Sequence, residues 1–139
     1  MSGIDLSVNP LHLGLGATAE VEPTFTGEMD WYEAYGARHQ SDGDDGRLVA
    51  MHTFTESWPM WEMHPQGAEV VVCTAGSITL YQEKADGSKA TVTLAPGQCV
   101  INEPGTWHTA DIDNEATALF ITSGRGTQHR PRGQGSSTG

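Results

Sequence analysis

The sequence has few cysteines and no long apolar segment. Only two of its 139 residues are cysteines, Cys73 and Cys99, and they do not form a CxxC pair, which excludes a disulfide-built scaffold. We expect both to be reduced thiols in the core. The longest apolar run is the four residues 70–73, far below the roughly 20 that span a bilayer. Because the N-terminus also lacks the basic start and apolar core of a signal peptide, we expect a cytoplasmic protein.

Basic residues are scarce as well. Seven lysines and arginines stand against 18 acidic residues, which gives a formal net charge of −11. Three of the seven, Arg125, Arg130 and Arg132, lie in the last fifteen residues, so the rest of the chain is more acidic still. Nucleic acids and anionic lipid surfaces bind basic patches, and we therefore expect neither as a partner. A neutral, cationic or metal-bound small molecule suits this charge balance better.

The length of the chain is that of one domain. Residues 1–25 contain prolines and glycines but little apolar periodicity, and we expect an irregular N-terminal arm that can add a strand to a dimer. We expect residues 26–124 to form the folded β-barrel domain. Residues 125–139 are rich in Gly, Ser and Arg, so we expect a mobile basic tail.

Turn signals recur about every ten residues within the central domain, a spacing typical of a sandwich or small barrel of short strands. We therefore predict an all-β fold, a small β-barrel or jelly roll that is closed or nearly closed. Residues 28–38 alone have helical spacing, and they predict a short helix or turn. The predicted strands are 47–55, 60–64, 69–74, 77–83, 90–94, 99–102, 108–112 and 117–123.

Acidic and imidazole side chains gather on predicted strands. Side chains two apart on a strand share a face, so Glu62 and His64 point the same way. Glu69 lies on a strand that is apolar on both sides, and a buried carboxylate costs several kcal/mol unless it is paired, protonated or bound to a metal. His108 begins a later strand. These four residues form a candidate set of metal ligands.

This arrangement resembles the cupin superfamily, and the resemblance covers residues 51–123. The first cupin motif, G(X)5HXH(X)3-4E(X)6G, is matched from its second histidine onward by His64, Glu69 and Gly76. The second motif, G(X)5PXG(X)2H(X)3N, is matched by Gly97, Gly105 and His108. Glu62 stands where cupins usually have the first histidine, Glu103 stands at the motif's proline, with Pro104 next, and Ile112 stands at its asparagine.

The resemblance implies a jelly-roll barrel, commonly a homodimer, with one divalent metal near the barrel axis. Two carboxylates and two imidazoles suit Fe, Mn, Zn or Ni, and the sequence does not choose among them. Glu62 is either a fourth ligand, a catalytic general base or a residue at the rim. Gln66 is an alternative oxygen ligand, and without a metal His64 and His108 would be ordinary buried histidines.

Further residues near the motifs have simpler interpretations. Strand parity places Trp61 and Trp107 on the face opposite the candidate ligands, whereas Trp58 can share the cavity face; packing is the default for all three. We expect Cys73 to lie on the Glu69 face without acting as a nucleophile. His12, His39, His52 and His129 are expected to be surface or packing residues, with His52 the one that can line a cavity.

We therefore predict a metal-dependent enzyme that acts on a small oxygen-bearing molecule. Its chemistry would be either dioxygenase-type oxidation or Lewis-acid isomerisation or lyase chemistry. The alternative is a non-catalytic cupin that binds a small ligand at a degenerate metal site, and the substitution of Glu62 for histidine motivates it. The tail has two interpretations. Residues 125–132 either form a clamp that binds an acidic ligand or are a cluster of solvated charges.

Overall fold

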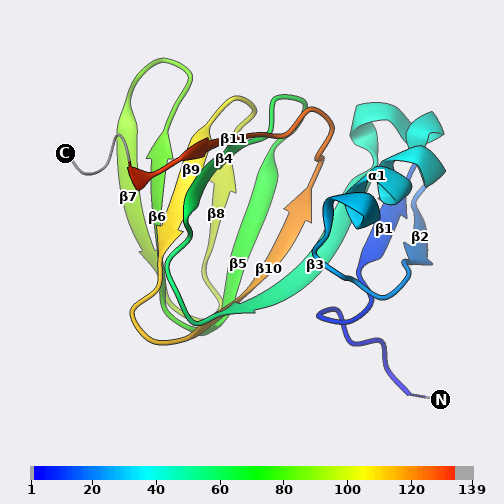
Figure 1. Ribbon diagram of the computed structural model, residues 1–139, viewed down its shortest axis with the longest axis horizontal. Coiled ribbons are helices and arrows are strands. Elements are labelled where there is room, and N and C mark those ends of the chain that lie inside the picture. The colour runs from blue at the N-terminus through cyan, green and yellow to red at the C-terminus, as the bar shows by residue number, and fades with distance from the viewer. Residues whose placement is uncertain (1, 134–139) are drawn as a thin grey trace.

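The computed structural model describes residues 2–133, which form two antiparallel sheets that face each other (Figure 1). One sheet has six strands, in the spatial order β2 (Thr18–Val21), β1 (Leu11–Gly14), β3 (Arg47–Phe54), β10 (Ala116–Thr122), β5 (Glu69–Gly76) and β8 (Cys99–Asn102). The other has five strands, in the order β11 (Gln128–Pro131), β4 (Met60–Met63), β9 (Trp107–Asp111), β6 (Ile78–Glu83) and β7 (Lys89–Leu94).

The predicted all-β jelly roll is confirmed, and each of the eight predicted strands is present within a few residues of its expected bounds. The predicted helix at 28–38 is α1 (Met29–Arg38), and a short 3₁₀ helix, Gln40–Asp45, follows it. The strands remain two separate sheets and do not close into one continuous barrel.

Three strands lie in segments for which the sequence predicted no regular structure. Strands β1 and β2 form a hairpin within the expected irregular arm, and β1 extends the six-stranded sheet by pairing with β3. Strand β11 lies within the expected tail and pairs antiparallel with β4 along its four residues. Residues 134–139 of that tail lie outside the described residues.

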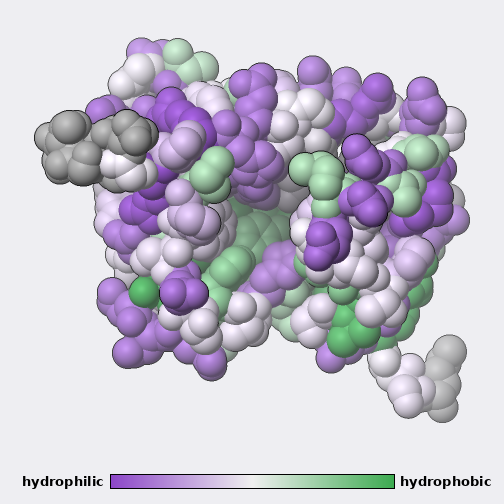
Figure 2. All heavy atoms as spheres, in the orientation of Figure 1, coloured by the Kyte–Doolittle hydropathy of each residue, from purple (hydrophilic) through white to green (hydrophobic). Residues whose placement is uncertain are grey.

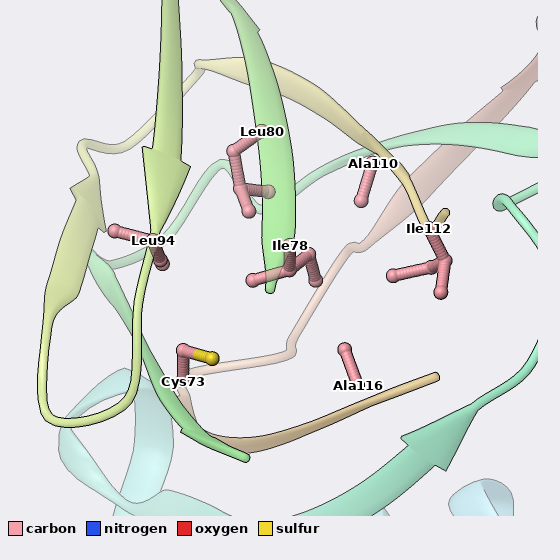
Figure 3. Close-up of a cluster of buried hydrophobic side chains, with 7 residues drawn as sticks. All are labelled: Cys73, Ile78, Leu80, Leu94, Ala110, Ile112 and Ala116. Carbon is pink, nitrogen blue, oxygen red and sulfur yellow. The ribbon is translucent and has the colours of Figure 1, made fainter. Parts of the chain in front are cut away.

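Alternate side chains of the two sheets pack into a shared apolar core. Figure 3 shows seven of them converging from both sheets: Cys73, Ile78, Leu80, Leu94, Ala110, Ile112 and Ala116. Burying an isoleucine or leucine side chain contributes roughly 1.5–3 kcal/mol, so this cluster stabilises the face-to-face packing. Cys73 is buried here as expected, whereas Cys99 is exposed because it lies on the outer side of the edge strand β8.

One motif glycine has a clear steric role at the end of β5. Gly76 adopts a φ of +72°, a left-handed conformation that favours glycine. A Cβ atom at this position would collide with the backbone carbonyl oxygen of Glu115. The glycine therefore lets β5 end against the start of β10.

The N-terminal hairpin and α1 lie together at one end of the molecule, beyond β3 (Figure 1). Trp31 is the buried anchor of α1, and its indole Nε1 donates a hydrogen bond to the carbonyl oxygen of Pro23 at 3.2 Å. Within residues 2–133, no helix combines the length and the apolar composition that crossing a membrane would require.

Candidate metal centre

The fold brings the four candidate ligands together between the two sheets. Glu62 on β4 lies directly opposite His108 on β9 in the strand register. His64 directly follows β4, two residues after Glu62 and on the same face, and Glu69 begins β5 in the facing sheet. One potential ligand atom from each residue lies within 4.8 Å of those of the other three. The structure thus brings the four candidate ligands together, and their binding of an ion stays a prediction.

The carboxylate oxygens and imidazole nitrogens of this cluster are in close contact. His64 Nε2 lies 3.2 Å from Glu62 Oε1 and 3.2 Å from Glu69 Oε2. His108 Nε2 lies 3.1 Å from Glu69 Oε1 and 3.6 Å from Glu62 Oε1. Two donors that bind one ion at about 2.1 Å and at right angles are about 3.0 Å apart. The spacing of the four groups therefore suits ligation of a single ion.

Each of the two imidazoles has its Nε2 atom at the centre of the cluster. Among residues 2–133, the Nε2 atoms of His64 and His108 are buried and have no hydrogen-bond partner, although carboxylate oxygens stand close by. The contacts with those oxygens are ion-pair contacts that do not meet the geometry of a hydrogen bond. A buried polar atom without a partner costs roughly 1–3 kcal/mol, and a metal ion bound by both nitrogens would remove this cost.

The other nitrogen of each ring has a partner that sets the tautomer. The Thr127 hydroxyl donates to the carbonyl oxygen of Gly124 at 2.8 Å, so it accepts the Nδ1–H of His64 at 2.7 Å. His108 Nδ1 donates to the carbonyl oxygen of Thr106 at 3.2 Å. When either ring is neutral, these partners keep its proton on Nδ1, so Nε2 then presents a lone pair to the centre, the form that a metal ion binds.

Glu69 is held by donors on both oxygens. Asn102 Nδ2 donates to Oε1 at 3.1 Å, and the Thr122 hydroxyl donates to Oε2 at 2.7 Å. Gln82 Nε2 in turn donates to Asn102 Oδ1 at 2.8 Å. This buried carboxylate is therefore oriented from the side away from the two imidazoles, as metal-ligating carboxylates usually are.

The charges of the cluster shift its pKa values strongly. Burial opposes ionisation of all four groups, but their mutual contacts outweigh it. The two carboxylates raise the pKa of His64 to about 9 and that of His108 to about 10. The histidines lower the pKa of Glu69 to about 2 and that of Glu62 well below its usual range. Without an ion the cluster is a paired set of two anions and two cations at neutral pH.

Sequence reasoning missed the contribution of β11 to this centre. His129 lies opposite Glu62 in the β11–β4 register, and its Nε2 is 3.0 Å from Glu62 Oε2. The same segment supplies Thr127, the partner of His64. We expected His129 to be a surface or packing residue; it is partly exposed but binds a candidate ligand. The only available signal was that residues 127 and 129 share a face if the segment is extended.

The basic residues of this segment bind the protein's own surface. Arg130 lies over the rings of Trp61 and Trp107, with its Cζ atom 5.1 and 4.5 Å from their centroids, and it pairs with Glu83 at 2.7 Å. Arg132 pairs with Asp111 at 2.8 Å. Both tryptophans are thus on the outer face, as strand parity predicted, and the two arginines anchor β11 rather than forming a free acidic-ligand clamp.

A cleft of about 1260 Å³ opens on the candidate centre. It lies between α1 with the following 3₁₀ segment on one side and strands β3, β4 and β10 on the other. Figure 2 shows a hollow near the middle of this face with an apolar floor. Glu62 has 31% of its side chain exposed, whereas Glu69, His64 and His108 are almost fully enclosed, so the centre is reached from the Glu62 side. His52 lines the cleft, as does Trp58.

A second polar cluster lies at the α1 end of the cleft. His12 is 2% exposed, and its Nδ1 and Nε2 atoms lie 2.6 Å from the Tyr35 hydroxyl and 2.6 Å from Asp42 Oδ2. The ring of His39 stacks on it at 3.6 Å and contacts Glu22 at 2.9 Å. His12, His39 and Asp42 are close enough together to hold an ion. Both nitrogens of His12 already have partners, however, and the cluster ties α1 to β1.

No protein-family model matches this sequence, and no curated protein sequence matches it. Solved structures do match its fold. An oxalate oxidase aligns with a TM-score of 0.51 and 13% identity, over 58% of this chain and 44% of that one. A cupin-2 domain protein from Shewanella frigidimarina aligns at 0.46 and 17%, over 55% and 69%. A hydroquinone 1,2-dioxygenase from a Sphingomonas species aligns at 0.47 and 12%, over 55% and 59%.

The aligned region spans less than half the length of that oxalate oxidase. Likeness at this level of identity concerns the fold alone. The alignment with the oxalate oxidase shows a shared fold, and the chain has the cupin fold.

Proposed function

We propose that this protein is a metal-dependent enzyme that acts on a small oxygen-bearing molecule. One divalent transition metal ion, Fe, Mn, Zn or Ni, would be held by His64, Glu69 and His108 together with Glu62. The observation that carries the proposal is the pair of buried Nε2 atoms that lack hydrogen-bond partners and face two carboxylates.

When bound, such an ion supplies Lewis-acid polarisation of a ligand oxygen or, for a redox-active metal, oxidative chemistry. The chain's own residues divide the remaining work. Asn102 and Thr122 keep Glu69 in place, and the Nδ1 partners of the two histidines hold their rings in the ligating tautomer. These contacts leave Glu62 as the adaptable member of the set.

Glu62 is also the group best placed to move a proton. Of the four candidate ligands, Glu62 alone has a substantially exposed side chain, which lines the cleft. His129 Nε2 lies 3.0 Å from its Oε2. We propose that Glu62 either completes the ligand set or accepts a proton from the bound molecule as general base, with His129 stabilising its charge. Both roles would follow from the position of Glu62 on the open side of the cluster.

A second candidate function is supported by the charge balance of the cluster. Its two carboxylates are already neutralised by two histidines without any ion. The cleft would then be a non-catalytic binding site for a small ligand with a degenerate metal site. Metal analysis separates this function from the first.

We also propose that the protein is a homodimer assembled through its N-terminal arm. Exposed apolar side chains concentrate there, and β2 is an edge strand whose four residues are all exposed. The side chains are Ile4, Val8, Leu13, Leu15 and Val21. Light scattering of the whole chain and of a Leu13→Ser, Val21→Ser variant tests this, because a monomeric mass for the unaltered chain overturns it.

Elemental analysis of untagged protein purified without chelator tests the metal proposal. We expect about one equivalent of a transition metal in the wild type and in His39→Asn, which alters only the second polar cluster. We expect the metal to be lost from His108→Asn and His64→Ala. Glu62→Ala shows whether that carboxylate is a ligand. Wild-type protein with less than about a tenth of an equivalent, before and after reconstitution, overturns the proposal and favours the binding function.

A further inference from the structure

The charges around the cleft are unfavourable for a small anion. An ion held by Glu62 and Glu69 would have its two positive charges balanced by two carboxylates. Among the described residues, Arg125 is the one lysine or arginine that lines the cleft, and it is 56% exposed and lies 3.6 Å from Asp44. Two further acids, Glu33 and Glu56, line the same cleft. A dicarboxylate entering here would lose its hydration, and beyond the ion itself the one lysine or arginine of residues 2–133 that could compensate is Arg125, which already pairs with Asp44.

The floor of the cleft is a continuous set of aromatic rings that ends at the candidate centre. The Phe54 ring centroid lies 6.2 Å from that of His52 and 5.5 Å from that of Trp58. Phe120 packs against Trp58 at 6.0 Å. Trp58 in turn meets His108, a candidate ligand, edge-on at 6.3 Å. A ligand that reaches the metal site along this floor therefore lies against rings.

An aromatic side chain also stands on the opposite side of the cleft. Tyr32 on α1 lines it and is 42% exposed. Aromatic rings favour offset-stacked or edge-to-face neighbours at centroid distances of about 4.5–7 Å. A flat ring between Tyr32 and the floor would find such neighbours on two sides, whereas a hydroxyl-rich sugar would lose water without matching donors from Phe54 and Phe120.

We propose that the ligand of this cleft is an electrically neutral, hydroxylated aromatic molecule, whose ring packs on the Phe54–Trp58–Phe120 floor and whose hydroxyl oxygen reaches the Glu62 side of the metal centre. The inference rests on the proposed function, because it names the substrate class of the same site. It excludes small carboxylate anions as the preferred ligands.

Calorimetric titration of Zn(II)-loaded protein with catechol and with oxalate tests the proposal. Both probes present two oxygen atoms to an ion, but catechol alone is neutral and carries a ring. We expect catechol to bind at least about tenfold more tightly than oxalate. Phe54→Leu and Tyr32→Leu should each weaken catechol binding about two- to tenfold and leave oxalate binding unchanged. Tyr32 is exposed, so its replacement does not threaten folding.

Tyr81→Leu, on the outer side of the five-stranded sheet, is the matched control and should bind catechol like the wild type. The inference is overturned if oxalate binds as tightly as catechol or more tightly, or if Phe54→Leu and Tyr32→Leu bind catechol like the control. If the protein still holds one equivalent of zinc in that case, the proposed function stands. If the protein binds no zinc, the proposed function fails. In that case catechol is titrated into the metal-free protein. If catechol binds and Tyr32→Leu weakens the binding, the ligand class is still supported. If catechol does not bind, the ligand class is overturned.

Discussion

His129 lies directly opposite Glu62 in the pairing of β11 with β4, with 3.0 Å between Nε2 and Oε2. The contact links the C-terminal strand to the most exposed residue of the candidate centre. It restrains a carboxylate that lacks the two-sided support of Glu69, which is held by Asn102 and Thr122.

His129→Ala should therefore weaken metal binding up to about tenfold, since partners of metal ligands usually contribute about ten- to a hundredfold and this one is partly exposed. Competition with a chelator measures the affinity. Gln128→Ala removes an exposed side chain from the same strand, pointing the other way, and should have no effect. Equal losses of metal affinity in the two variants would show that the His129 side chain makes no specific contribution and that the effect comes from disturbing β11.

Replacing Glu69 should destabilise the metal-free protein as well as abolish metal binding. Glu69→Gln leaves two buried imidazolium groups facing Glu62 alone, and breaking a buried charge pair costs about 3 to 5 kcal/mol. Urea unfolding at pH 6 measures the loss. Glu103→Gln, an exposed carboxylate in the turn before β9, should change the free energy of unfolding little. A Glu69→Gln protein as stable as this control would contradict the pairing described above.

The metal-free protein should lose stability as the pH rises from about 6.5 to 10. The folded pKa values of His64 and His108, about 9 and about 10, lie above the ordinary 6.5, so their stabilising contribution is complete below pH 6.5 and is lost as they deprotonate. That of Glu69, about 2, lies below the ordinary 4.5, so its contribution is complete above pH 4.5 and is lost towards pH 2.

The cluster thus stabilises the metal-free fold most between about pH 4.5 and 6.5. Thermal unfolding at a series of pH values measures this, and His108→Gln should show a shallower decline above pH 6.5. A Tm that is independent of pH between 6.5 and 10 would show that the imidazoles are not charged in the fold.

Gly76→Ala should destabilise the protein by about 2 to 5 kcal/mol, because it adds a left-handed backbone conformation and a collision with the Glu115 carbonyl. Gly36→Ala is its matched control. Gly36 lies in α1 with no atom within 4 Å of an added Cβ, so alanine there should stabilise by up to about 1 kcal/mol. The denaturant midpoints of both variants measure the change. If both variants lose stability equally, the effect comes from introducing alanine in general and not from a steric role of Gly76.

The sequence predicted those strands that bury alternate apolar side chains. Strands such as β5 and β6 alternate between buried and partly exposed positions, and the turns between strands carry Gly, Pro and Asp. The same period of two placed Glu62 and His64 on one face and Glu69 on a buried one. The candidate centre followed from that parity together with the spacing of the two motifs.

The sequence did not predict strands that are stabilised by edge pairing rather than burial. All four residues of β2 are exposed, and β11 has no buried residue and carries Gln, His and Arg before Pro131. Strand β11 is held by backbone pairing with β4 and by Arg130 on two tryptophans, contacts between residues far apart in the chain. The His12 cluster escaped prediction for the same reason, since its partners come from α1 and the 3₁₀ segment.

The candidate ligands do not all belong to one sheet. Glu62 and His108 lie in the five-stranded sheet, with His64 directly after β4, whereas Glu69 belongs to the six-stranded sheet. An ion bound by all four would therefore be a cross-link between the two layers of the sandwich, placed at one end of their apolar core. Its removal would release both layers at once, so amide protons of β5 and of β9 should begin to exchange faster together rather than one after the other.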